Sequence, residues 1–236
     1  MPLIQWTKMS DKLLSQRWDA EYETGKYAHE PPVNFVNTIL STLERFPEIK
    51  NGRGLYVGCG NGRNYLPLIR TGLNLYGLDA SKIALKQLSE QEPSFGNKLF
   101  CEDFRSFDAD SLFDYLIAIQ VFQHGGQKDI EQYFTKAASL LKPQGLFFLR
   151  VNSISTQIKF QHNILERNDL GGFTIQYLEG PKRDLPIHFY SRDELLSMTR
   201  NDFSLIVEPI QQIIPREPPK KGNWAQWEVV FKKNPS

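Results

Sequence analysis

Short apolar runs alternate with longer amphipathic stretches from Gly54 to Val151, and no other feature limits the fold as strongly. Each run has the length of a strand and is bounded by turn residues, as is typical of strands buried on both faces. Because parallel strands need a crossover connection, usually a helix, this alternation favours a parallel sheet. We predict strands at Gly54–Val57, Leu73–Leu78, Lys98–Cys101, Phe113–Ile119 and Gly145–Val151.

Two predicted helices connect these strands. Ser81–Gln91 begins at a serine suited to cap a helix, and Gln127–Leu141 ends at the helix-stopping sequence Lys-Pro-Gln-Gly. Right-handed crossovers then put helices on both faces of the sheet. In such a sheet the ligand crevice lies outside the carboxyl ends of the strands.

The flanking segments have patterns of their own. Met9–Phe46 shows the apolar periodicity of helices. Beyond Val151 the pattern loosens until Ser191, where a short capped helix is predicted. The strand-like runs Ser204–Ile210 and Trp224–Lys232 are joined by a polar, proline-rich connection, which predicts an antiparallel hairpin.

Together these patterns predict a Rossmann-like, doubly wound α/β fold. We expect a mostly parallel seven-stranded sheet with a C-terminal antiparallel hairpin and an N-terminal helical cap. No linker rich in glycine and serine separates two units, so a single domain over residues 1–236 is expected. Its parts are the helical cap (1–50), the ligand-binding core (51–151), and a substrate-side insertion with the last helix and the hairpin (152–236).

Charge and cysteine content narrow the classes of function. The chain has 28 Lys and Arg against 27 Asp and Glu, a net charge of +1, and lacks the basic excess that nucleic-acid binding usually needs. Cys59 and Cys101 are too few for a disulfide framework, and we interpret both as reduced thiols. No apolar run approaches the length of a membrane span and no leader peptide is recognisable, so a cytoplasmic location without a membrane partner is expected.

The strongest local motif is GLYVGCGNGRN, in which Gly58, Gly60 and Gly62 directly follow a predicted strand. Glycines there let the backbone turn tightly and approach a ligand closely, while free N–H groups of the following helix face the same point. A plain tight turn is the alternative explanation, because a glycine-rich loop alone is weak evidence.

Acidic residues end the next two predicted strands. Asp79 closes the second strand, where a carboxylate can accept hydrogen bonds from both ribose hydroxyls, although a helix cap is the other interpretation. After the third strand, Asp103 is a candidate for an adenine amino group and Phe104 for the adenine face. Glu102 and Asp103 alone are more typical of a solvated loop, and the succession of glycine loop and two acids makes the set specific.

These residues resemble the class I methyltransferases that use S-adenosylmethionine (SAM), over roughly Asn51 to Val151. The resemblance implies SAM as the cofactor and implies roles for the motif residues. Gly58, Gly60 and Gly62 border the methionine part, Asp79 holds the ribose, Asp103 with Phe104 holds the adenine, and the strand end from Gln120 to His124 lies beside the sulfonium and substrate.

Tyr56 departs from the pattern of this family. Many relatives carry an acid two residues before the first glycine, where this chain has the tyrosine. The contact to the SAM amino group must then come from another acceptor, such as a backbone carbonyl of Gly58 or Gln120.

The N-terminal string RWDAEYETGKYAHEPP resembles the opening of small-molecule methyltransferases of the thiopurine and tellurite-resistance type. That resemblance implies a segment folded over the cofactor. Trp18, Tyr22 and Tyr27 offer aromatic faces to a sulfonium or a flat substrate, with ordinary helix packing as an equal alternative for Trp18. His188 is a further candidate for the substrate pocket, again with simple packing as the alternative.

We therefore expect SAM-dependent methyl transfer to a small-molecule acceptor by in-line displacement, without a metal. His124 is the candidate general base, and a structural histidine in a capping loop is the other interpretation. A non-catalytic SAM-binding scaffold and a methyltransferase acting on protein or nucleic acid stay open. An NAD-dependent oxidoreductase is disfavoured, because its fingerprint needs a glycine where Arg63 stands. The sequence predicts neither the acceptor nor the oligomeric state.

Overall fold

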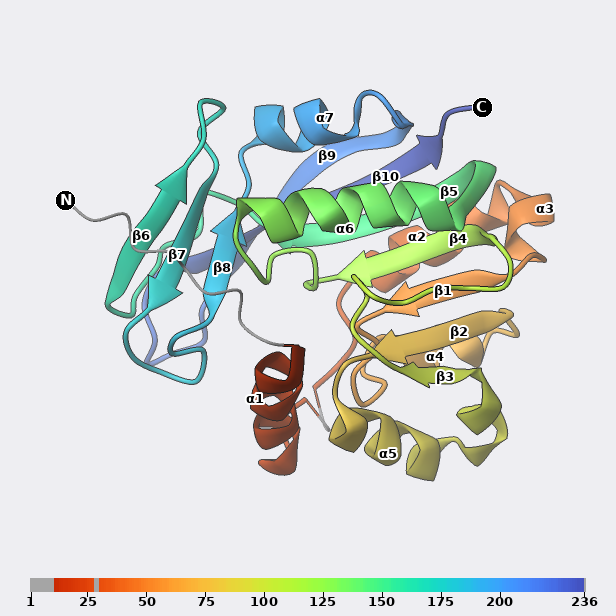
Figure 1. The fold of residues 1–236 in the computed structure, drawn as a ribbon, viewed down its shortest axis with the longest axis horizontal. Coiled ribbons are helices and arrows are strands. Elements are labelled where there is room, and N and C mark those ends of the chain that lie inside the picture. Colours follow the sequence, from red (N-terminus) through yellow and green to blue (C-terminus); the bar gives the residue numbers. More distant parts are fainter. Residues whose placement is uncertain (1–10, 28–29, 236) are drawn as a thin grey trace.

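The computed structural model describes residues 11–27 and 30–235, and a seven-stranded sheet organises it. The strands are β1 (Gly54–Val57), β2 (Leu75–Asp79), β3 (Leu99–Cys101), β4 (Phe113–Ile119), β5 (Leu141–Asn152), β9 (Phe203–Pro215) and β10 (Asn223–Lys233). They lie in the order β3-β2-β1-β4-β5-β10-β9, with helices on both faces (Figure 1). β1 to β5 pair in parallel, and β10 is antiparallel to both its neighbours. The predicted fold class is confirmed.

The helices cover the sheet in two layers. They are α1 (Asp11–Glu23), α2 (Phe35–Glu44), α3 (Pro47–Lys50), α4 (Tyr65–Ile69), α5 (Lys82–Gln91), α6 (Gln127–Leu140) and α7 (Arg192–Thr199), with a 3₁₀ turn at Pro93–Lys98. As the sequence predicts, Ser81 and Ser191 cap α5 and α7: their hydroxyls accept hydrogen bonds from the backbone N–H groups of Ala84 and Glu194.

Side chains of β5 point alternately to the two faces of the sheet and pack into two separate hydrophobic cores. Phe147 and Leu149 pack on the side of α6 and α7, whereas Leu146 and Phe148 pack on the side of α2, α4 and α5. Phe147 is fully buried, and its ring lies 5.6 Å from those of Phe122 and Phe203, centroid to centroid. Burial on both faces explains why the strand runs in the sequence are almost wholly apolar.

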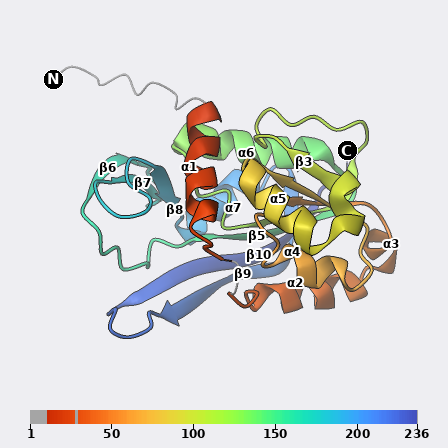
Figure 2. The same cartoon turned by 90° about the horizontal axis from the view of Figure 1, so that it is seen from below.

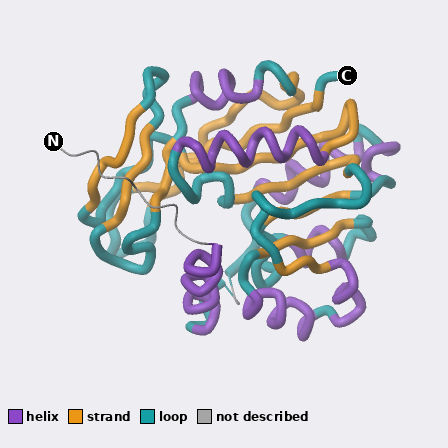
Figure 3. Tube along the Cα trace, viewed as in Figure 1, coloured by secondary structure: helices purple, strands orange, loops and turns teal. Residues whose placement is uncertain are grey.

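A second, three-stranded antiparallel sheet occupies the region where the sequence shows no clear pattern. It consists of β6 (His162–Arg167), β7 (Phe173–Tyr177) and β8 (Pro186–Phe189), in that order. Figure 3 shows these strands set apart from the main sheet. Isolated bridges join the two sheets, from His124 to Ile187 and from Ser153 to Tyr190. The small sheet is therefore anchored beside the ends of β4 and β5.

The C-terminal hairpin is longer than the sequence predicts. β9 continues to Pro215 rather than ending near Ile210. Figure 2 shows the β9–β10 hairpin reaching beyond the rest of the molecule. The predicted end fell short because the added residues are mostly exposed and carry no alternation of apolar and polar side chains.

We expect Phe147→Ala to lower the free energy of unfolding by about 3–5 kcal/mol, because it removes a fully buried ring and leaves a cavity. Leu112→Ala is the matched control: Leu112 is 40% exposed, and its loss should change stability by no more than about 0.5 kcal/mol. Urea unfolding followed by circular dichroism measures both. Equal effects would contradict the packing described for β5.

Candidate functional site

The glycine loop between β1 and α4 turns sharply at the carboxyl edge of the sheet. Gly58 and Gly60 have φ angles of +69° and +54°, in the left-handed region that favours glycine. A β-carbon on Gly58 would overlap the side chain of Val121, and one on Gly60 would overlap the hydroxyl of Tyr22. Both positions therefore require glycine, for backbone conformation and for close approach.

Asp79 ends β2 and binds the glycine loop directly. One carboxylate oxygen accepts a hydrogen bond from Gly60 N at 2.8 Å, and the other accepts one from Ser81 N at 2.8 Å. Burial raises the pKa of Asp79 to about 6, although these two N–H groups oppose the rise. A carboxylate has about four lone-pair sites, so acceptor capacity remains for a ligand with paired hydroxyls. This donor set fits a ribose.

Asp103 and Phe104 follow β3 as predicted, but protein groups already contact both. The Asp103 carboxylate accepts hydrogen bonds at 2.8 Å from the Arg105 backbone N–H and from two guanidinium nitrogens of Arg105. The Phe104 ring is buried 5.4 Å from the ring of Phe122. An adenine amino group would have to share Asp103 with Arg105.

The end of β4 brings Gln120 and His124 to the same edge. Gln120 has φ +60° and donates its backbone N–H to the carbonyl of Arg150 at 2.7 Å. Burial first, and then the nearby Lys182, hold the pKa of His124 well below its usual range. Within the described residues its buried Nδ1 has no hydrogen-bond partner. His124 is therefore neutral near physiological pH, and its Nδ1 is enclosed by the protein.

Helix α1 lies over this edge and bridges two parts of the fold (Figure 1). Toward the core, one Asp19 oxygen accepts hydrogen bonds from the Ser81 hydroxyl at 2.6 Å and from Ile83 N at 3.1 Å. Toward the small sheet, the Trp18 ring packs 4.9 Å from the His124 ring, and Lys182 Nζ lies 5.8 Å from the Trp18 centroid. Sequence reasoning assigned no role to Asp19 or Lys182, although Asp19 follows Trp18 in the motif.

The predicted aromatic residues of the N-terminal segment are not equivalent. Tyr22 is buried with its hydroxyl against Gly60, and its ring lies 5.7 Å from that of Tyr27. The Tyr27 hydroxyl instead donates to Glu21. Tyr22 thus contacts the glycine loop, whereas the Tyr27 ring packs against the ring of Tyr22.

The backbone N–H of His188 donates to the carbonyl of Gln123 at 2.8 Å, but the His188 side chain has other partners. Its ring is fully buried, with Nδ1 2.9 Å from the Thr174 hydroxyl and Nε2 3.0 Å from the carboxylate of Glu194. Both ring nitrogens therefore have protein partners, between β7 and α7. The structure does not bring His188 together with Trp18 and His124.

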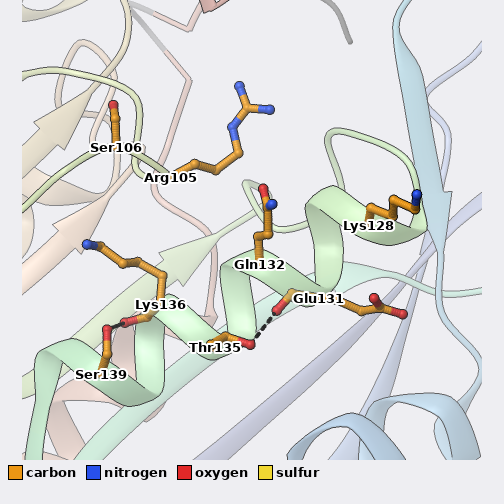
Figure 4. A pocket seen from close by; sticks show the side chains of 8 residues that line it. All are labelled: Arg105, Ser106, Lys128, Glu131, Gln132, Thr135, Lys136 and Ser139. Atoms are coloured by element: carbon orange, nitrogen blue, oxygen red, sulfur yellow. Dashed lines mark hydrogen bonds between the residues drawn. The ribbon is translucent and has the colours of Figure 1, made fainter. Parts of the chain in front are cut away.

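A hollow of about 710 Å³ lies elsewhere, along the outer face of α6 (Figure 4). It is open, its lining residues are polar or charged, and Asp79 and the residues of the glycine loop are not among them. Its lining residues are Arg105, Ser106, Lys128, Glu131, Gln132, Thr135, Lys136 and Ser139.

Across residues 11–27 and 30–235, no three His, Cys, Asp or Glu side chains are grouped so as to hold a metal ion. No helix described here is long and apolar enough to cross a membrane.

Comparison with known proteins agrees with the geometry of the carboxyl edge. Residues 55–149 match the family model for the methyltransferase domain. Over these residues the chain has a methyltransferase domain of the class I SAM-dependent superfamily. It is 28% identical over 101 residues to the ubiquinone biosynthesis O-methyltransferase of Bartonella bacilliformis, and 29% identical over 139 residues to that of Rickettsia akari. These matches cover 40% and 58% of the chain but only 39% and 55% of the relatives, less than two thirds of either.

Solved structures share the fold over nearly the whole chain. The 1,6-didemethyltoxoflavin-N1-methyltransferase of Burkholderia thailandensis superposes with a TM-score of 0.64 at 15% identity, covering 98% of this chain and 93% of that one. The magnesium protoporphyrin IX methyltransferase of Synechocystis gives 0.65 at 12% identity, covering 97% and 99%. The first structure holds S-adenosylhomocysteine (SAH) and the second holds SAM. These structures confirm the fold. The methyltransferase-domain match over residues 55–149 confirms the predicted superfamily and, with it, SAM as the cofactor, and the narrower thiopurine and tellurite resemblance stays a prediction.

We expect SAH binding to weaken as the pH falls through about 6, because protonation of Asp79 removes an acceptor for the ribose. Asp79→Asn should remove this pH dependence, and Asp79→Ala should weaken binding by roughly 1.5–3 kcal/mol. Calorimetry at several pH values measures both effects.

The stability of the protein without ligand should depend on pH in the opposite direction to SAH binding: it should rise as the pH falls. The folded pKa of Asp79, about 6, lies above the unfolded value of about 3.9. Its contribution to stability is therefore fully present below about pH 4 and is lost as the pH rises through 6. An Asp79→Ala protein with unchanged SAH affinity and a lower melting temperature would show that the residue only caps α5.

Proposed function

We propose that this chain transfers the methyl group of SAM to a small-molecule acceptor. The observation that supports this best is the meeting of the glycine loop, the Asp79 carboxylate and His124 at one edge of the sheet, beneath α1. The names of the related proteins support the same proposal, since ubiquinone biosynthesis and 1,6-didemethyltoxoflavin involve small molecules.

The chain's own residues fit the cofactor. In this proposal Gly58, Gly60 and Gly62 border the methionine part, Asp79 binds the ribose hydroxyls, and Gln120 lies beside the sulfonium. Asp103 and Phe104 take the adenine, with Arg105 sharing Asp103. SAM supplies a methyl group already activated on a sulfonium. The protein therefore has to orient an acceptor and keep water out.

The acceptor pocket in this proposal lies between α1 and the end of β4. Trp18 and Tyr22 form its aromatic wall, supported by Tyr27, and α1 excludes water from the edge. If the acceptor carries an N–H or O–H group, His124 accepts its proton. Lys182 opposes protonation of His124 beforehand, so the ring is neutral and ready to act as a base.

Transfer of a labelled methyl group from SAM tests the proposed function. We expect label in a product when the protein is supplied with a panel of small amines, phenols and heterocyclic N–H compounds, and much less label with Asp79→Ala when SAM is limiting. Protein and RNA extracts form separate arms of the assay. Label in those arms alone would assign a macromolecular acceptor, and SAH binding without any labelled product would indicate a non-catalytic scaffold.

The pH profile tests the role of His124. Because its pKa is held well below the ordinary value of about 6.5, kcat at saturating SAM, where Asp79 is occupied by the cofactor, should stay level through that value and fall only at more acid pH. His124→Asn should lower kcat by roughly 10²–10⁴-fold, the range for a general base, and abolish the acid limb. His162→Asn, on the small sheet, is the control. Unchanged kcat in His124→Asn would make His124 a packing partner of Trp18.

A further inference from the structure

A buried polar patch lies on the α2 side of the sheet, where the apolar residues Leu146 and Phe148 would lead one to expect only apolar neighbours. Arg150 and Asn152 occupy this face of β5. Glu228 and Gln226 of β10 lie directly opposite them in the antiparallel register. Arg150 Nε donates to Glu228 at 2.8 Å, and Gln226 donates to the Asn152 side chain at 2.8 Å. The patch sits at the carboxyl end of β5.

The patch leaves polar groups without partners. Arg150 has a side chain only 4% exposed, yet among the residues described its single hydrogen-bonding partner for the guanidinium is Glu228. The two terminal nitrogens, which carry four N–H donors, have no hydrogen bond to any described residue and are not fully enclosed, so a ligand can reach them. Gln226 is 3% exposed, and its Oε1 is buried without a partner in the same part of the chain. An unpartnered buried oxygen such as that of Gln226 is costly, and the nearby terminal nitrogens of Arg150 have unused donors, so this arrangement points to a ligand that contacts both residues.

The same patch borders the cofactor edge. The backbone carbonyl of Arg150 accepts the N–H of Gln120, the residue at the end of β4. Burial lowers the pKa of Arg150 and Glu228 raises it, and Arg63 and Tyr56 are near enough to contribute. Tyr56 is the residue that replaces the acid of many relatives. Arg150 therefore lies close enough to Tyr56, at the position where many relatives carry an acid, for the two groups to interact electrostatically.

We propose that Arg150 binds a carboxylate in this site through its terminal nitrogens, and that Glu228 is a positioning residue that holds the guanidinium in place. A planar guanidinium pairs with a carboxylate through two parallel hydrogen bonds, a geometry that lysine does not provide. The free oxygen of Gln226 suits an N–H donor of the same ligand. The carboxylate belongs either to the methionine part of the cofactor or to the acceptor, so the inference rests on the proposed function.

Calorimetry on the full chain separates the two sources. SAH carries the amino-acid group, whereas 5′-methylthioadenosine keeps the adenine, ribose and sulfur without it. If the carboxylate is that of the cofactor, Arg150→Gln should weaken SAH binding by about tenfold or more and leave 5′-methylthioadenosine binding unchanged. If it belongs to the acceptor, both affinities stay unchanged. Benzoate should then bind the SAH-saturated wild type more tightly than benzamide, and Arg150→Gln should lose that preference.

Glu228→Gln tests the positioning role, and its expected effect on ligand affinity is opposite to that of Arg150→Gln. Its amide oxygen can still accept from Arg150 Nε, but the competing negative charge is gone, so the carboxylate ligand should bind at least as tightly as in the wild type. Arg192→Gln, which breaks an exposed pair with Glu208, is the control and should leave every affinity unchanged.

Two outcomes would overturn the assignment. Arg150→Gln could match the wild type for SAH and for the benzoate preference, or it could weaken SAH and 5′-methylthioadenosine equally, which would mark Arg150 as purely structural. A wild type that binds neither SAH nor 5′-methylthioadenosine would instead count against the proposed function.

Discussion

The buried carboxylate of Asp79 is the interaction on which the site depends. It accepts hydrogen bonds from the glycine loop and from the start of α5, and so joins β1, β2 and the helix that follows β2. Parallel strands bring these segments to one edge, because every carboxyl end points the same way. Burial disfavours the charged form that the hydrogen bonds favour, which leaves a carboxyl with an elevated pKa and unused acceptor capacity. Such a group is more typical of a ligand site than of a simple cap.

Helix α1 depends on the same point of the structure. Asp19 binds Ser81, the residue whose N–H contacts Asp79, and Gln87 of α5 donates to the carbonyl of Tyr22. The other side of α1 meets His124 and Lys182, which belong to the end of β4 and the small sheet. A helix with polar contacts at the cofactor edge and aromatic contacts toward the small sheet couples the two regions. Movement of α1 would expose both at once.

The sequence predicts the parallel core well and the small sheet not at all. The predicted strand Phe113–Ile119 has the same bounds as β4, because a strand buried on both faces leaves a continuous apolar run in the sequence. β6 has no such run, since its side chains are mostly exposed or half-buried on both faces. Its strand conformation comes from pairing with β7, a contact between segments that local periodicity cannot report.

The sequence likewise predicts some features of the candidate site and not others. The glycine loop and Asp79 follow from backbone requirements that leave a mark in the sequence, and the structure brings them together as expected. The partners of Asp103 and His188 do not leave such a mark. Arg105 folds back onto Asp103 within two residues, and Glu194 reaches His188 from a different element. Whether an acid meets a ligand or a neighbouring arginine is decided by side-chain packing, which spacing alone does not specify.

The pairing of β10 with β5 shows how such packing constrains the fold in turn. Arg150 faces Glu228 and Asn152 faces Gln226 across the junction between the parallel and antiparallel parts of the sheet. A slip of one residue would turn Glu228 and Gln226 toward the apolar face that holds Trp227 and Val229, leaving Arg150 buried without its partner. Buried ion pairs add little net stability, but breaking one is costly. The polar pairs therefore specify the register of β10, and with it the position of the hairpin relative to the carboxyl edge.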